Sequence, residues 1–241
     1  MALKSEGVCF YCNEIVSKQG ITKHISSHLK KMEKEINYDT KSTDTYYQIS
    51  ITADEMFLVI IIESKVSFTT LDVFLRDIWV ECCGHMSSFR TKSGISIMDA
   101  DYDSQSMKTP LSDIYEKGLI MDYEYDFGST TYLKVKFVNE YILPKQKKKI
   151  KLISRNEPLP IVCTMCKKEY AREICLVDID YDYKDGYFCK KCSKEHAKEC
   201  EDFDDYAKTK IVNSPRAGIC GYDGGSIDKK RDGYYKPKTI S

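Results

Sequence analysis

Two Cys-x-x-Cys pairs constrain this chain more than any other feature of its sequence. They are Cys163 with Cys166 and Cys189 with Cys192. Four thiolates at about 2.3 Å complete a closed tetrahedral shell around Zn²⁺ and leave no position for a reactive water. The spacing therefore predicts a structural four-Cys zinc ribbon over residues 161–207. Two unrelated surface turns, or a pair of disulfides, are the alternatives.

A second set of metal-binding residue types lies near the N-terminus. Cys9 and Cys12 are followed by His24 and His28 in the pattern Cys-x2-Cys-x11-His-x3-His. On a helix the two histidines lie one turn apart on the same face, where both can reach an ion held by the two thiolates. The pattern predicts a Cys2His2-like zinc finger over residues 1–37, with an inner spacer one residue shorter than usual. A small helical arm without metal is the alternative.

Charge is balanced over the whole chain but not along it. Lys plus Arg and Asp plus Glu both number 37, so no overall basic excess draws the protein to nucleic acid or to an anionic membrane. Residues 38–143 are acidic, whereas residues 144–160 form a predicted basic linker. Its cations are candidate contacts to nucleic-acid phosphates, and a merely solubilising linker is the alternative. They are Lys145, Lys147, Lys148, Lys149, Lys151 and Arg155.

The cysteine content and the absence of an export signal favour a reducing compartment. The chain has 11 cysteines, arranged partly as metal-binding pairs, and its longest apolar run is far too short to span a bilayer. We therefore expect a cytoplasmic protein with zinc at two structural sites and no membrane contact. Cys175, Cys200 and Cys220 could be spare ligands or a redox centre. His196 could compete as a ligand, but we interpret it as part of a solvated helix.

The central residues 45–142 carry the pattern of an α+β domain. A Thr69-x-x-Asp72 start signal precedes apolar residues at helical spacing as far as Cys82, and a short helix is expected at 110–117. We expect a mostly antiparallel sheet with this amphipathic helix packed on it, flanked by the two small zinc modules. Around Asp178 we expect a strand and a turn, and from 208 to 241 a Gly-rich tail. The expected strands are residues 46–53, 56–63, 87–90, 95–98, 119–127 and 130–138.

Three stretches resemble a known family. Helix 71–83 running into Gly84-His-Met-Ser-Ser-Phe89, and the hairpin Tyr123-Glu-Tyr-Asp-Phe-Gly128, are similar to the plasmid pRiA4b ORF-three-like domain, and residues 213–222 resemble a tail segment of some members. The resemblance implies a protein of the kind carried on plasmids, phages and insertion elements, with no established biochemical activity. Where the family continues with Asp, Trp and His, this chain has Ser129, Thr131 and Leu133.

Two classes of function are compatible with these features. A Cys/His-dependent, hydrolase-like enzyme would have to use Cys82, Cys83, His85 and Asp126, but Cys82 lies on the apolar helix stripe, where a buried and inert thiol is expected. No phosphate-binding glycine loop, Ser elbow or His-Glu-x-x-His motif occurs. We therefore expect a non-enzymatic accessory protein of a mobile element. It would bind a protein or, peripherally and unspecifically, nucleic acid through its zinc modules and basic linker, in an undetermined oligomeric state.

Overall fold

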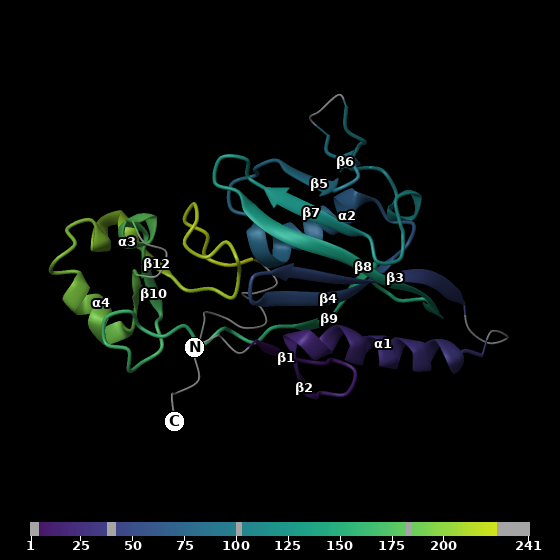
Figure 1. Cartoon of the computed structure of the whole chain (residues 1–241), viewed down its shortest axis with the longest axis horizontal. Coiled ribbons are helices and arrows are strands. Elements are labelled where there is room, and N and C mark those ends of the chain that lie inside the picture. Colours follow the sequence, from purple (N-terminus) through teal and green to yellow (C-terminus); the bar gives the residue numbers. More distant parts are fainter. Residues whose placement is uncertain (1–4, 38–41, 100–102, 182–184, 226–241) are drawn as a thin grey trace. The chain divides into compact units, whose positions relative to one another are not determined.

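The computed structural model describes residues 5–37, 42–99, 103–181 and 185–225 (Figure 1). The chain divides into two compact units. The sheet unit comprises Ser5–Leu75 and His85–Glu157, and the cysteine-rich unit comprises Arg76–Gly84 and the described residues from Pro158 onward. The fold is of the α+β class that the sequence predicts, with one large antiparallel sheet and few helices.

The sheet unit is built on a seven-stranded antiparallel sheet. Five of its strands fall where the alternating and β-branched segments of the sequence predict them, and the short strand expected at 95–98 is reduced to two residues. Along the first half of β8 the burial alternates, so that Leu133, Val135 and Phe137 are buried while the residues between them are exposed. In spatial order the strands are β6 (Ser96–Ile97), β5 (Ser87–Thr91), β7 (Ile120–Tyr125), β8 (Thr131–Pro144), β3 (Thr43–Ala53), β4 (Met56–Glu63) and β9 (Ile150–Arg155).

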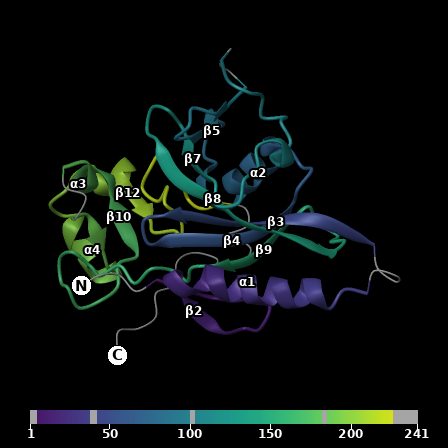
Figure 2. The same ribbon diagram turned by 45° about the vertical axis from the view of Figure 1, so that its right-hand side comes forward.

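One helix covers each face of this sheet (Figure 2). Helix α2 (Phe68–Leu75) packs on the face that carries Phe89 and Tyr123, and its Phe68 ring lies 5.1 Å from that of Phe89. Helix α2 ends earlier than the helix expected at 71–83, because the α-helix gives way to a π-helical turn at Arg76–Val80. The last three side chains of that turn are all buried, so burial there is not confined to one helical stripe.

The loop before β7 differs from the expected short helix at 110–117. Only a 3₁₀ turn, Leu111–Asp113, forms there. Tyr115 instead stacks on Tyr47 of β3, with ring centroids 4.0 Å apart and planes nearly parallel. Packing of this aromatic pair against the sheet therefore replaces the remaining helical turns.

The predicted basic linker 144–160 is wrong in its centre. Residues 150–155 form strand β9, which pairs antiparallel with β4 at one edge of the sheet. The cause is the apolar content of this stretch, since Ile153 is fully buried among the lysines. Residues 145–149 alone connect β8 to β9, so the basic side chains belong to the folded sheet unit.

The cysteine-rich unit contains a three-stranded sheet in the order β11 (Tyr187–Phe188), β10 (Glu173–Cys175), β12 (Lys208–Lys210). Its helices are α3 (Leu176–Tyr181) and α4 (Lys190–His196). The strand expected around Asp178 is wrong, because α3 begins directly after β10 and contains this residue. Residues 182–184 of the expected strand and turn lie outside the described residues. The first part of the expected Gly-rich tail is packed rather than loose: the Trp79 indole donates to the Asn213 carbonyl at 3.2 Å. The rest of that tail, from 226 on, lies outside the described residues.

Within the described parts of the chain, no helix combines the length and the apolar character that crossing a lipid bilayer requires.

Candidate metal centres

The N-terminal candidate site is a ββα arrangement. Strands β1 (Glu6–Val8) and β2 (Ile15–Ser17) form a hairpin that leads directly into helix α1 (Lys18–Lys34). The connecting turn holds both cysteines and is closed by two backbone hydrogen bonds, Cys9 N–H to Glu14 O and Asn13 N–H to Cys9 O. Asn13 adopts a φ of 62°, a left-handed conformation that asparagine tolerates better than most residues.

The hairpin and the helix bring together the residues that the spacing predicts. The ligand atoms of the N-terminal cluster, Cys9, Cys12, His24 and His28, all lie within 4.8 Å of one another. His24 Nε2 is 3.2 Å from Cys12 Sγ and 3.2 Å from His28 Nε2. Ligand atoms of a tetrahedral zinc shell lie about 3.3 to 3.8 Å apart, given Zn–N and Zn–S bonds of about 2.0 and 2.3 Å. The donor set and its spacing therefore fit a zinc ion.

The finger is not the separate domain expected at residues 1–37, because α1 lies along the sheet (Figure 2). Ile21, Ile25 and Leu29, spaced one turn apart, are buried in one apolar cluster with side chains of β3, β4, β8 and β9. A polar contact fixes the same interface: Ser26 Oγ donates to Gln48 Oε1 at 2.8 Å, inside the interface. The helix thus uses one face for the candidate metal site and another for the sheet.

The second candidate site is the four-Cys cluster of Cys163, Cys166, Cys189 and Cys192, whose sulfurs lie within 4.8 Å of one another. Cys166 Sγ and Cys189 Sγ are 4.0 Å apart, close to the separation of two thiolates on one zinc ion. The first pair sits in a turn in which Lys167 N–H donates to Cys163 O. The second pair sits at the start of α4, where Cys189 Sγ accepts from Cys192 N–H.

The thiols of the four-Cys cluster have unequal environments. The Lys168 backbone N–H donates to Cys166 and lowers the pKa of its thiol to about 6, a shift typical of a thiolate ligand. Burial raises the pKa of the Cys192 thiol. A cation in the cluster would offset that burial, because a coordinating thiol is deprotonated outright. The buried thiols are therefore suited to a metal ion rather than to solvent.

Further cysteines gather in the same unit. The sulfurs of Cys82, Cys83 and Cys220 lie within 4.8 Å of one another, and Cys83 Sγ is 3.6 Å from Cys220 Sγ. Hydrogen bonds with the Cys220 and Cys82 thiols raise the pKa of Cys83 to about 11. A nucleophilic cysteine requires the opposite shift, so Cys83 lacks the lowered pKa of an activated thiol.

In the sheet unit, the residues proposed for that enzyme form a loose pair. His85 Nε2 lies 3.6 Å from Asp126 Oδ2, beyond hydrogen-bond distance. The Asp126 carboxylate accepts from the Gly128 backbone N–H at 3.1 Å, which fixes the turn between β7 and β8. This contact gives Asp126 a structural role in the β7–β8 hairpin.

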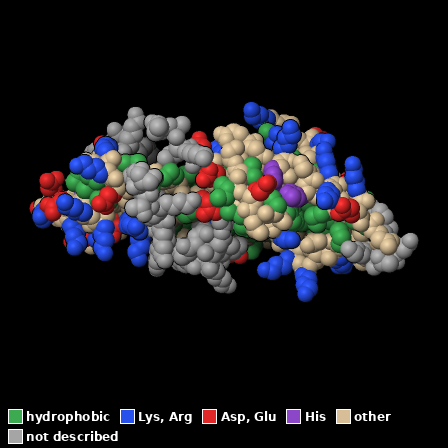
Figure 3. Space-filling model, turned by 90° about the horizontal axis from the view of Figure 1, so that it is seen from below, with side chains coloured by type: hydrophobic (Ala, Val, Ile, Leu, Met, Phe, Trp, Pro, Cys, Tyr) green, Lys and Arg blue, Asp and Glu red, His purple; other side chains and the backbone are tan. Residues whose placement is uncertain are grey.

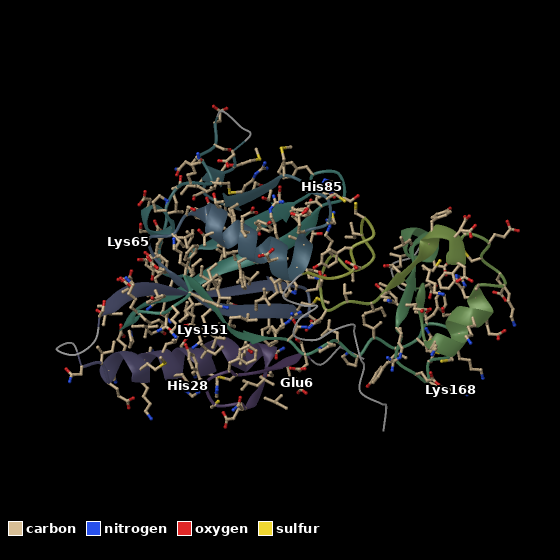
Figure 4. The ribbon with its side chains drawn as sticks, turned by 180° about the vertical axis from the view of Figure 1, so that it is seen from behind. Glu6, His28, Lys65, His85, Lys151 and Lys168 are labelled. Carbon is tan, nitrogen blue, oxygen red and sulfur yellow. The ribbon has the colours of Figure 1, made fainter. Side chains whose placement is uncertain are left out.

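The basic residues of the predicted linker fall into two groups. Arg155 is fully buried, so it is not placed to meet a phosphate and that part of the prediction is wrong. Lysines 145, 147, 148, 149 and 151 are exposed. Lys151 lies on β9 beside α1, which carries His28 (Figure 4), and its Nζ lies 5.2 Å from the centre of the Tyr11 ring. Of the exposed lysines, Lys151 therefore lies near the N-terminal cluster.

A side chain that the sequence placed on a solvated helix is in fact buried. His196, at the end of α4, is 8% exposed, and its ring nitrogen belongs to a group with Cys175 and Cys200 whose ligand atoms lie within 4.8 Å of one another. The interpretation of His196 as solvated is wrong. Its i+4 spacing from Cys192 was the available signal, since that spacing puts both residues on one helix face.

No protein-family model and no curated protein matches this chain. Among solved structures it is similar to the crystal structure of a protein of unknown function, MM3350 from Methanosarcina mazei Go1. The two sequences are 22% identical, the alignment covers 48% of this chain and 68% of that chain, and the TM-score is 0.37. A similarity this low carries no argument about function.

Proposed function

We propose that this protein is a non-enzymatic, zinc-binding accessory protein. The observation that carries the proposal is the closure of two four-ligand shells, one of two cysteines and two histidines and one of four cysteines. In each shell four side chains fill a tetrahedral coordination sphere, and a catalytic zinc would need one position kept for water. Zinc in these shells would stabilise the fold. The function of the protein would then be to bind a partner macromolecule.

The partner we favour is the phosphate backbone of nucleic acid. Eight exposed lysines lie on α1, on the loop between β8 and β9, and on β9 itself, and we name them the basic surface. Figure 3 views the face that carries α1 and shows Lys and Arg side chains around surface histidines. The members of the basic surface are Lys23, Lys30, Lys31, Lys34, Lys147, Lys148, Lys149 and Lys151.

Two contacts show that the last turns of α1 and the loop between β8 and β9 lie at one end of the sheet unit. The backbone N–H of Ile142, near the end of β8, donates to Glu33 Oε1 of α1 at 2.7 Å. The Lys149 carbonyl accepts from Glu63 N–H at the end of β4. The last turns of α1 and the lysine-rich loop therefore both adjoin the strand ends.

Unspecific contact to phosphates suits this surface better than base reading. Lysine ammonium groups act as point charges on phosphates, whereas sequence is read by side chains that reach base edges. Ile21, Ile25 and Leu29 commit one face of α1 to the sheet, which restricts how deeply this helix can enter a groove. The contact would therefore be peripheral and strongly dependent on salt.

A salt series tests this proposal. Gel shifts of the full chain with random-sequence DNA and RNA should show binding at 50 mM salt that weakens about a hundredfold by 200 mM, as expected for about four phosphate contacts. Changing lysines 147, 148 and 149 to Ala should weaken binding at low salt and flatten the salt slope. The matched control changes Lys92, Lys108 and Lys117 to Ala, since these lysines are exposed but lie outside the basic surface.

The contrary result is binding that is absent at 50 mM salt, or equally weakened by both triple variants. That result would favour a protein, rather than nucleic acid, as the partner that binds the N-terminal finger. One observation favours that second candidate: Phe10 and Ile15, on the metal-binding hairpin, are 41% and 58% exposed. Apolar side chains on a rigid hairpin are common anchors of protein interfaces.

We also propose that the protein belongs to a mobile genetic element. Of the residues that resemble the plasmid pRiA4b ORF-three-like family, those in α2, β5 and the β7–β8 hairpin belong to the sheet unit. Asp72 accepts hydrogen bonds from Ser87 Oγ at 2.6 Å and Tyr123 Oη at 2.8 Å, so these three elements are tied together by polar contacts in the core. The proposal of an accessory protein of a mobile element rests on the sequence resemblance of these residues.

A further inference from the structure

Cys175, His196 and Cys200 form a third candidate metal centre inside the cysteine-rich unit. Their ligand atoms all lie within 4.8 Å of one another. Cys175 is fully buried at the end of β10, and Cys200 follows His196 by four residues, with its backbone N–H donating to the His196 carbonyl at 2.9 Å. One strand end and one helical turn therefore present two sulfurs and one imidazole to a common point.

The imidazole of His196 is held in place by aromatic packing. Its ring stacks on Phe188 at 4.3 Å between centroids and meets Phe203 edge to face at 4.9 Å. Its buried Nε2 has no hydrogen-bond partner among the residues that the structure describes. A buried imidazole nitrogen without a partner is costly unless something binds it, and histidine is a common zinc ligand.

A fourth donor lies next to that nitrogen. Asp178, in the first turn of α3, places its Oδ2 3.4 Å from His196 Nε2. Nitrogen and oxygen ligands at about 2.0 to 2.2 Å from a tetrahedral zinc are separated by about 3.3 to 3.5 Å. Asp178 and His196 also line the same surface cavity, through which an ion could enter. This separation suits two ligands of one ion. Asp178 is not among the residues whose ligand atoms all lie within 4.8 Å of one another, so its carboxylate would have to approach the two sulfurs to complete the shell.

We infer that the cysteine-rich unit binds a second zinc ion through Cys175, Asp178, His196 and Cys200. The ligands of this Cys-Asp-His-Cys cluster alternate along the chain with those of the four-Cys cluster. Cys163 with Cys166, and Cys189 with Cys192, hold the first ion. Cys175 with Asp178, and His196 with Cys200, hold the second. The two ions therefore cross-link segments that alternate along the chain.

The cross-linking explains how so small a unit holds its shape. Its main apolar cluster consists largely of cysteines, with Phe188, Phe203 and Ala207 as the chief other buried members. Helix α4 carries Cys192 for one ion and His196 for the other. Strand β10 ends at Cys175, and β11 is followed directly by Cys189. The unit has a second apolar cluster around Ala171, Ile174 and Ile211, but the larger cluster is built mainly from candidate ligands. Small modules of this kind commonly require metal or disulfides to persist.

The test measures zinc in the purified full chain by elemental analysis. Cys200→Ser should lower the zinc content by one equivalent per chain relative to the unchanged protein. Cys163→Ser should lower it by two, because it removes the four-Cys ion and unfolds the segment that holds the second ion. Asp178→Asn should weaken retention of the same equivalent by at least about tenfold against a chelator, since even outer partners of zinc ligands matter that much. Glu199→Gln, an exposed carboxylate beside Cys200, is the matched control and should retain full zinc.

Cobalt substitution gives a readout that survives if a variant folds poorly. In the unchanged protein, Co²⁺ added at increasing ratios should give tetrahedral absorption bands that continue to grow after the N-terminal and four-Cys clusters are filled. Unchanged zinc content in both Cys200→Ser and Asp178→Asn would overturn the inference, as would a Cys175–Cys200 disulfide found by mass spectrometry in the native protein. Neither result touches the two closed shells of the proposed function, because their zinc is measured separately through Cys12→Ser and Cys163→Ser.

Discussion

The two regions with metal-binding patterns differ in how much apolar packing would hold them folded without metal. In the N-terminal region, α1 buries Ile21, Ile25 and Leu29 against the sheet, together with Tyr46 and Phe57. In the cysteine-rich unit, the main cluster of buried residues is made largely of the candidate ligands themselves. The same type of motif is therefore supported by hydrophobic burial in one region and by coordination in the other.

This difference separates two uses of a zinc motif. Where a large apolar surface already exists, an ion can fix a hairpin on a helix that the sheet holds in place. Where the segment is short and polar, the ion must supply most of the folding free energy, as in small zinc domains that unfold without metal. The comparison predicts a different response to ligand loss in each region.

The largest expected effect is the loss of the four-Cys cluster. Cys163→Ser should abolish amide-exchange protection over residues 161–207, because structural zinc contributes on the order of 10 kcal/mol in small modules and that exceeds what this core can replace. Hydrogen exchange with mass spectrometry measures this directly. Lys168→Ala, an exposed side chain in the same turn, should retain protection. Protection that survives Cys163→Ser would show that the unit does not depend on metal.

The second-largest expected effect is a loss of stability in the sheet unit, where hydrophobic burial holds α1 on the sheet. Ile25→Ala removes a fully buried side chain and should lower the free energy of unfolding of the sheet unit by about 2 to 5 kcal/mol. Urea denaturation followed by far-UV circular dichroism measures it. The control is Lys23→Ala on the exposed face of α1, for which a change within about 0.5 kcal/mol is expected. Equal effects of the two changes would mean that the docked face contributes nothing.

Much of the fold can be predicted from the sequence because local patterns and tertiary packing agree. The β-branched run of β4 and the alternation of β8 each specify a strand whatever their neighbours are. The strand β9 could not be recognised as easily, since its lysines conceal a short apolar core in which Ile153 is fully buried. The π-helical turn at Arg76–Val80 depends on packing that no local pattern announces.

The candidate sites divide in the same way. Cysteines and histidines at fixed spacing specify a shell by themselves, so Cys9 to His28 and Cys163 to Cys192 are brought together as expected. The Cys-Asp-His-Cys cluster is harder to foresee, because Asp178 is a common surface residue and His196 lies outside any familiar motif. The docking of α1 did have a signal: Ile21, Ile25 and Leu29 recur every fourth residue, which is more apolar surface than a lone finger buries.

A third, smaller effect is expected for a ligand of the finger. Cys12 is exposed, so Cys12→Ser removes one candidate ligand without disturbing the apolar core. Exchange should accelerate in the hairpin 6–17, while α1 stays protected by its contacts with the sheet, and the loss of stability should be less than for Ile25→Ala. Gln19→Ala, an exposed side chain at the start of α1, is the control and should leave exchange in the hairpin unchanged. Unfolding of α1 in Cys12→Ser would make the finger as metal-dependent as the cysteine-rich unit.

The smallest effect concerns the polar contact between α1 and the sheet. Ser26→Ala removes the hydrogen bond that Ser26 Oγ donates to the buried Gln48, and should cost about 1 kcal/mol. The loss is limited because Gln48 keeps its amide hydrogen bond to the Thr22 carbonyl at 3.0 Å, and its Oε1 can still accept from Tyr141. Ser27→Ala, next to it on the exposed side of the helix, is the matched control and should be nearly neutral, because its hydroxyl donates only within α1. Chemical denaturation of the two variants, measured side by side, separates them, and a Ser26→Ala change as neutral as Ser27→Ala would leave apolar burial alone to hold the finger on the sheet.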